Sequence, residues 1–208
     1  MLAIETASEA CSIALVEGGE IIAHEHRLIG RGHAEALVPM IGALPGKGQS
    51  ERILVSLGPG SFTGVRIGLA TARALGFAWH AEVLGYPTLA LIAATAQAAR
   101  PRAAVTVCVN GGHGEWFVQD FGPEGLPLDQ ARSLTPAAAR SRPCQTLLAG
   151  NRASALAALD PALPAEVIEG LPDARSVPLL PATLLTPDLA PIYGRAPDAT
   201  PMAERTTA

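Results

Sequence analysis

Aromatic side chains are scarce in this sequence, and long apolar runs are absent from it. Phe, Trp and Tyr make up 4% of the 208 residues, whereas 49% of the residues are hydrophobic. We therefore expect a core built from aliphatic side chains. No apolar run reaches the roughly 18 residues that a membrane-spanning helix needs. Met1–Ile4 also runs directly into Glu5 without the pattern of a secretory signal. The sequence thus predicts a cytoplasmic protein without membrane contact.

Cysteine and positive charge are also in short supply. The three cysteines, Cys11, Cys108 and Cys144, are widely spaced and form no CxxC pair, which favours buried thiols in a reducing compartment over a disulfide framework. The formal charge of −4 argues against a protein that binds nucleic acid alone through its phosphates. His24 and His26 have no third ligand in local reach, so no metal site is predicted.

The order of apolar segments predicts an α/β fold. An N-terminal antiparallel meander turns at Gly18-Gly19, and strands and helices then alternate up to about Ala99. Arg100-Pro101-Arg102 marks a boundary, and the strand and hairpin that follow repeat the opening pattern faintly. Beyond residue 121 only three ordered pieces are predicted, over residues 145–150, 151–159 and 166–168.

The stretch from Gly58 to Gly76 carries the strongest local signal. Its loop consists of Gly58, Pro59, Gly60, Ser61, Phe62, Thr63 and Gly64, and Ser61 or Thr63 can supply the N-cap of the helix that follows. One interpretation is a phosphate cradle at a helix N-terminus. The other is a tight strand-to-helix turn that lets the helix pack closely. Neither the P-loop pattern nor GxGxxG fits, so the loop alone leaves both open.

Small residues recur every four positions along this helix, at Gly64, Gly68, Ala72 and Gly76. This small-residue ridge allows close approach of a neighbouring backbone. We interpret it as an outward-facing surface for a partner helix. Arg66 and Arg73 lie two turns apart on one face, where they form either a solvated edge or the rim of that interface.

Three segments resemble the TsaB (YeaZ) family of bacterial proteins that support tRNA threonylcarbamoyladenosine synthesis. They are Ile4–Ser12, the helix that begins at His33, and the motif GPGSFTGVRIGL from Gly58 to Leu69. Gly114-Glu115 and Pro191–Arg195 also resemble segments of this family. The resemblance covers residues 1–120 well and the remainder loosely.

The resemblance implies an actin-like, Hsp70-like ATPase (ASKHA) fold in two lobes, of which the second is reduced. We expect a first lobe over residues 1–101, a reduced second lobe over 102–195 and a disordered tail over 196–208. It further implies a subunit without catalysis of its own, which supports the catalytic paralogue TsaD and works with the ATPase TsaE. TsaD transfers threonylcarbamoyl to the adenosine next to the anticodon. The alternative is a small ATP-dependent kinase or hydrolase of the same fold.

The resemblance places the partner contact on two helices of the first lobe. The predicted interface residues are His33, Leu37, Met40, Ile41, Gly64, Arg66, Gly68, Leu69, Ala72, Arg73 and Gly76. The free chain is expected to pair with itself through the same surface, and tRNA is expected to contact it only within the complex.

Departures from the family pattern bear on nucleotide chemistry. Glu5 stands where the family has aspartate, so Glu5 and Thr6 form a vestigial nucleotide loop, and Asn110-Gly111-Gly112 replaces an Asp-Ala-Arg pattern. No histidine pair opens the helix at Thr88, so the metal site of the paralogue is absent. We therefore expect no tightly bound cofactor, although the partner interface leaves room for a nucleotide. Neither Ser61 nor His33 has the spacing of a catalytic nucleophile or base.

Overall fold

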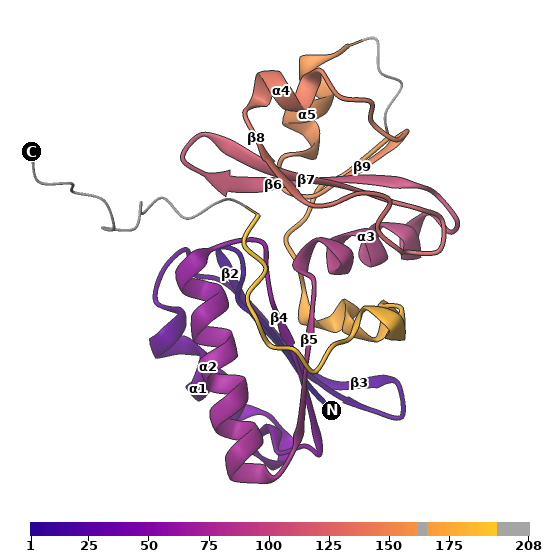
Figure 1. Ribbon diagram of the computed structural model, residues 1–208. Coiled ribbons are helices and arrows are strands. Elements are labelled where there is room, and N and C mark those ends of the chain that lie inside the picture. The colour runs from indigo at the N-terminus through magenta and orange to yellow at the C-terminus, as the bar shows by residue number, and fades with distance from the viewer. Residues whose placement is uncertain (162–165, 195–208) are drawn as a thin grey trace, which may run out of the picture.

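The chain folds into two lobes, each built around a five-stranded sheet (Figure 1). The structure is a computed structural model that describes residues 1–161 and 166–194. The predicted tail over 196–208 lies outside these residues. Within the described ranges, no helix combines the length and the hydropathy needed to span a bilayer.

The first sheet has the strand order β3-β2-β1-β4-β5. Strands β1, β2 and β3 are antiparallel neighbours, and β4 and β5 continue the sheet in parallel with β1. Gly18 and Gly19 both have positive φ at the turn between β2 and β3, as the hairpin prediction requires. The elements of this lobe are β1 (Leu2–Glu5), β2 (Ala10–Glu17), β3 (Glu20–Leu28), α1 (His33–Ala43), η1 (Pro45–Gly48), β4 (Arg52–Ser56), α2 (Phe62–Trp79), β5 (Glu82–Tyr86) and α3 (Thr88–Ala99).

The second sheet repeats the same topology on a smaller scale. Its order, β10-β9-β6-β7-β8, has the same antiparallel and parallel pairs as the first sheet when it is read from β8. Its outer strands have three residues each. The elements are β6 (Val105–Gly112), β7 (Glu115–Phe121), β8 (Arg132–Leu134), α4 (Pro136–Arg140), β9 (Leu147–Ala149), α5 (Ala153–Leu159), β10 (Glu166–Ile168), η2 (Ala174–Leu179) and η3 (Ala182–Leu184). The predicted two-lobed α/β architecture with a reduced second lobe is confirmed.

Side-chain alternation in the first sheet separates two cores. Leu2 and Ile4 pack with α1 and α2 on one face, whereas Ala3, between them, packs with α3 and η2 on the other. Helix α3 lies between the two sheets (Figure 1) and shares a core with strands of both. The lobes are therefore joined by a continuous apolar core.

The small-residue ridge of helix α2 faces inward, which contradicts the predicted outward-facing surface. Gly64, Gly68, Ala72 and Gly76 are all buried against their own sheet and do not face outward. A Cβ atom at Gly64 would overlap the Thr6 carbonyl, and one at Gly68 would overlap Thr6 Oγ1. Thr6 Oγ1 donates a hydrogen bond to Gly64 O at 2.8 Å. Only residues without a bulky side chain fit at these positions because the helix lies close to the end of β1. Leu69 is also part of this core.

The residues of helix α1 that were predicted to contact a partner also face inward. His33, Leu37, Met40 and Ile41 are buried in the core of the first lobe and do not lie on its exposed surface. The His33 Nε2 atom donates to Ala10 O at 3.2 Å and holds the start of the helix against β2. The pattern of apolar residues alone does not distinguish the inner face of this helix from the outer one.

The second half contains more regular structure than predicted. Strand β8 and helix α4 form inside a stretch for which no order was predicted. After β10 the chain returns to the first lobe, where η2 packs against β1, β2 and β3. Gly85 then pairs with Thr186 as an isolated bridge at the edge of β5. The lobe limits at residues 101 and 195 stay a prediction.

Candidate functional site

A cavity of about 810 Å³ opens between the lobes at the N-terminus of α2. It is bounded by the β1–β2 turn and the start of α2 in the first lobe, the β6–β7 turn in the second, and the C-terminal segment. The lining residues are Ala7, Ser8, Glu9, Gly30, Gly60, Ser61, Phe62, Val65, Arg66, Asn110, Gly111, Gly112, His113, Phe117, Ile192, Tyr193 and Gly194.

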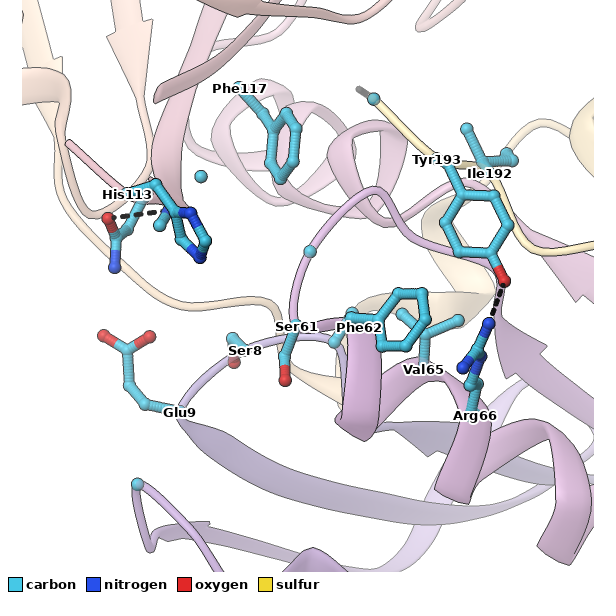
Figure 2. Close-up of a pocket in the computed structure, with 17 residues that line it drawn as sticks. Ser8, Glu9, Ser61, Phe62, Val65, Arg66, His113, Phe117, Ile192 and Tyr193 are labelled. Atoms are coloured by element: carbon cyan, nitrogen blue, oxygen red, sulfur yellow. Dashed lines mark hydrogen bonds between the residues drawn. The ribbon is translucent and has the colours of Figure 1, made fainter. Parts of the chain in front are cut away.

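One wall of the cavity is an aromatic clamp around Arg66 (Figure 2). The Arg66 Cζ atom lies 3.5 Å from the centroid of the Phe62 ring, and Arg66 Nη2 donates to the Tyr193 hydroxyl at 3.1 Å. The rings of Phe62 and Tyr193 are 5.7 Å apart. Two turns along α2, Arg73 Nη2 donates to Leu189 O at 3.0 Å. Both arginines thus fix the C-terminal segment along α2, a role that the sequence did not indicate.

The opposite wall holds a hydrogen-bond chain between the lobes. Asn151 Nδ2 donates to Glu9 Oε1 at 3.0 Å, and Asn151 Oδ1 accepts from the Asn110 amide at 2.9 Å. Glu9 belongs to the β1–β2 turn, whereas Asn110 lies near the C-terminal end of β6. Figure 2 shows Glu9 and His113 on the side of the cavity away from Arg66. Among the described lining residues, Glu9 carries the one carboxylate and Arg66 the one guanidinium, and protein groups bond both.

Glu5 does not reach this cavity. Its side chain is fully buried, and Glu5 Oε1 accepts from the Ala7 amide at 2.7 Å. The Tyr86 hydroxyl donates to Ile4 O at 2.9 Å and lies 3.3 Å from Glu5 Oε2. Burial raises the pKa of Glu5 to about 7, against hydrogen bonds from Ala7, Ser56, Tyr86 and Thr6 that lower it. The carboxylate therefore shapes its own turn and is turned away from the space between the lobes.

The glycine loop packs against the β1–β2 turn. Gly58 has positive φ, as expected for such a turn, and a Cβ atom at Gly60 would overlap the Ala7 carbonyl. The Ser61 amide donates to that same carbonyl at 2.7 Å. Ser61 Oγ accepts from the Gly64 amide at 3.2 Å, which confirms the predicted N-cap. This geometry favours the close-packing interpretation of the loop over the phosphate cradle.

The three cysteine thiols are poorly suited to nucleophilic catalysis. Burial raises the pKa of Cys11 to about 11 and that of Cys108 to about 12, and it also raises the pKa of Cys144. The thiolate, which is the reactive form, is therefore rare at neutral pH. Across the part of the chain that the structure describes, no cluster of three or more His, Cys, Asp or Glu could hold a metal ion.

The structure brings together only part of the predicted site. Gly60, Ser61 and Arg66 line the cavity, whereas Glu5 and Thr6 do not. Asn110–His113 and Ile192–Gly194 also line the cavity. Two sequence signals pointed to these segments: the change from the family pattern at Asn110-Gly111-Gly112, and the resemblance of Pro191–Arg195 to a segment of the family. Asn151 was missed because it lies 142 residues from its partner Glu9 and carries no local motif.

Comparisons with known proteins agree with the sequence motifs. The chain is 35% identical over 126 residues to the tRNA threonylcarbamoyladenosine biosynthesis protein TsaB of Escherichia coli, which covers 58% of this chain and 54% of that protein. It is 37% identical over 101 residues to the protein of the same name from Haemophilus influenzae, covering 46% and 42%. The chain thus spans about half the length of the curated relatives it matches.

The fold matches a solved relative over nearly its whole length. YeaZ from Pseudomonas aeruginosa superposes with a TM-score of 0.74, and the match covers 92% of this chain and 98% of that one at 24% identity. The likeness shows a shared fold, and the repeated strand order of the two sheets agrees with the predicted actin-like (ASKHA) fold.

A sequence model of one family matches more than half of the chain. It is described as TsaD, tRNA N6-adenosine threonylcarbamoyltransferase, and it matches residues 23–133 of the 208. These residues include α1, α2, the glycine loop and the β6–β7 hairpin. The chain therefore belongs to the TsaD family, and within it the chain is similar to the TsaB (YeaZ) proteins.

Proposed function

We propose that this chain is a non-catalytic subunit of the machinery that makes tRNA threonylcarbamoyladenosine. It binds a TsaD-like catalytic subunit through the outer face of α1 and α2, and a TsaE-like ATPase acts on the assembled complex. Transfer of threonylcarbamoyl to adenosine takes place on the catalytic subunit. The names of the curated relatives and the TsaD family match support this pathway.

The observation that carries the proposal is the apolar outer face of the two helices. Phe77 on α2 is 87% exposed and Val38 on α1 is 55% exposed, although both are large apolar side chains. The two helices contact each other on the same face of the sheet (Figure 1). We define the outer face by its exposed residues, Ala34, Glu35, Val38, Pro39, Gly42, Ala43, Arg66, Ala70, Arg73, Ala74, Phe77 and Ala78.

The composition of the outer face suits a protein partner. Its charged residues are Glu35, Arg66 and Arg73, and both arginine side chains bond the C-terminal segment, Arg66 at the Tyr193 hydroxyl and Arg73 at Leu189 O. Exposed apolar patches on folded chains mark interaction sites. Small side chains such as Ala70 and Ala74 let a partner helix approach closely, and Phe77 supplies a large anchor. The proposed contact therefore uses the two helices that the sequence predicted, α1 and α2. It uses their exposed faces, which lie opposite the buried residues that were predicted to make the contact.

The interlobe cavity supports a role without catalysis by the lone chain. Glu5 is buried, and Glu9 is held by Asn151, so the described lining offers no free carboxylate to order a phosphate-bound metal ion. Arg66 is the one side-chain guanidinium there, and Tyr193 and Phe62 hold it. No tightly bound cofactor is part of the proposal. A nucleotide, if present, binds where the partner completes the site, and tRNA meets the complex in the cytoplasm through the catalytic subunit.

Reconstitution tests this function. The purified chain alone should show negligible ATP turnover because protein groups bond both the Glu9 carboxylate and the Arg66 guanidinium of the described lining. Added to a TsaD-like subunit, a TsaE-like ATPase, threonylcarbamoyl-adenylate and tRNA, it should restore threonylcarbamoyl transfer. The measurement is modified adenosine per tRNA with and without the chain.

The rival function is that of a small ATP-dependent kinase or hydrolase, and the same preparation distinguishes it. Robust ATP turnover by the lone chain that Glu9→Gln abolishes would replace the subunit proposal with an enzyme. Exposed Glu20 offers a matched control, since Glu20→Gln makes the same change far from the cavity. Failure to stimulate transfer despite complex formation would also count against the proposal.

A further inference from the structure

Asp173 joins three elements on the face of the first sheet that packs against α3. Its carboxylate accepts from Ser12 Oγ on β2 at 3.3 Å and from the Arg175 amide at 2.9 Å. Arg175 Nη2 also donates to Asp173 Oδ2 at 2.8 Å. Ser12 Oγ in turn accepts from the Ala174 amide at 3.0 Å. The Ser12 hydroxyl thus bonds two consecutive residues, Asp173 and Ala174, and holds the start of η2 against β2.

Two histidines of β3 face the same carboxylate. His26 Nδ1 lies 3.4 Å from Asp173 Oδ2, and His24 Nε2 lies 3.9 Å from Asp173 Oδ1. Both nitrogen atoms are buried and make no hydrogen bond to any residue that the structure describes. They lie two residues apart on one face of the strand. The sequence placed them on this shared face but gave no sign of Asp173.

The segment that Asp173 anchors reaches the candidate site. From η2 the chain runs along β5, where the Gly85 amide donates to Thr186 O at 2.7 Å. It then passes Leu57, whose carbonyl accepts from the Ile192 amide at 2.7 Å, and ends beside Arg66 at Tyr193. Asp173 to Gly194, here called the C-terminal strap, therefore connects the histidine pair to a wall of the cavity.

The charges around His24 oppose its protonation. Burial lowers the pKa of His24, Arg175 and His26 lower it further, and Asp173 and Glu25 act in the opposite direction. Arg175 already pairs with Asp173 and holds the pKa of that carboxyl below its usual value against its burial. On the other strand face Arg27 pairs with Glu25, and from β5 the buried Tyr86 stays neutral because its pKa is raised.

We propose that Asp173 and the two β3 histidines form an acid-sensitive latch for the C-terminal strap. Protonation of His24 adds a partly buried second cation at Asp173, whose charge Arg175 already balances, and loosens η2 from the sheet. Because the folded state binds this proton more weakly than the unfolded chain does, the latch holds above the ordinary pKa of histidine. Its contribution is lost as the pH falls through that value toward the lowered one. Loosening η2 also frees the strap at the cavity wall.

Amide hydrogen exchange tests the latch in the full chain. Protection of the η2 amides, corrected for intrinsic exchange and referred to the β4 amides, is measured at about pH 5.5 and about pH 7.5, which bracket the histidine titration. The unmodified chain should lose protection several-fold at the lower pH. His24→Gln should show equal protection at both pH values, and Asp173→Asn should show low protection at both.

A second histidine provides the control. His80 lies exposed at the C-cap of α2 in the left-handed region, where asparagine is well tolerated, so His80→Asn should keep the pH dependence of the unmodified chain. Protection that is equal at both pH values in the unmodified chain would overturn the proposal. So would a pH dependence that survives in His24→Gln. Circular dichroism verifies that each variant is folded before exchange is compared.

Discussion

Gly68→Leu is expected to destabilise the folded chain by at least about 3 kcal/mol, the combined cost of overpacking a core and losing a buried hydrogen bond. A Cβ atom at this position already overlaps Thr6 Oγ1 and lies 3.4 Å from Val55 Cγ2, so a leucine side chain has no space. Moving the helix outward would break the bond from Thr6 Oγ1 to Gly64 O. Because whole domains are stable by only about 5–15 kcal/mol, this loss removes a large share of the total free energy of unfolding. Urea denaturation measures this change.

Two variants serve as controls for Gly68→Leu. Ala74→Leu adds a leucine to the exposed side of the same helix and should leave the free energy of unfolding nearly unchanged. Gly42→Ala on α1, where nothing lies within 4 Å of an added Cβ, should stabilise by roughly 0.5–1 kcal/mol. A folded Gly68→Leu variant with unchanged stability would mean that the small-residue ridge does not pack against β1.

Glu5→Gln is expected to stabilise the chain at alkaline pH and to have little effect near pH 4.5. The pKa of Glu5 is about 7 in the fold, against an ordinary value of 4.5. The unmodified chain therefore loses stability as the pH rises from 4.5 to 7, because the buried carboxyl must ionise, and the loss is constant above 7. A shift of this size corresponds to about 3 kcal/mol. Glutamine keeps an acceptor for the Ala7 amide without ionising.

The measurement is the free energy of unfolding of both chains at pH 5 and pH 8. The difference between the chains should grow with pH by about 2–3 kcal/mol, following the linkage of the raised pKa to stability. Exposed Glu20→Gln should show no such growth. A difference of the same size at both pH values would show that Glu5 does not titrate in this range.

The local features of the fold were predictable because short-range signals determine them. The hairpin at Gly18-Gly19, the cap at Ser61 and the limits of α3 all follow from residues within a few positions of one another. The repeated strand order of the second lobe was visible only as a faint likeness between two hairpins. Its short outer strands and α4 lack a periodic pattern, so tertiary contacts decide them.

The direction in which α2 faces could not be predicted. Apolar or small residues occur all round this helix, so periodicity identified which residues share a face but did not distinguish the sheet side from the solvent side. The deciding contact, between Gly64 and Thr6, joins residues 58 positions apart. Asp173 and the β3 histidines, and Glu9 with Asn151, are separated by even more of the chain.

The outer face of α1 and α2 is tested most directly by the mass of the complex formed with a TsaD-like catalytic subunit. Light scattering during size-exclusion chromatography should give a one-to-one complex for the unmodified chain. Phe77→Glu should remove that complex because it places a charge on the most exposed apolar side chain of the face. Leu128→Glu, the same type of change at a side chain 60% exposed in the second lobe, should leave it intact. The mass of the lone chain shows in the same run whether a second copy covers this face. An undiminished complex with Phe77→Glu would contradict the account.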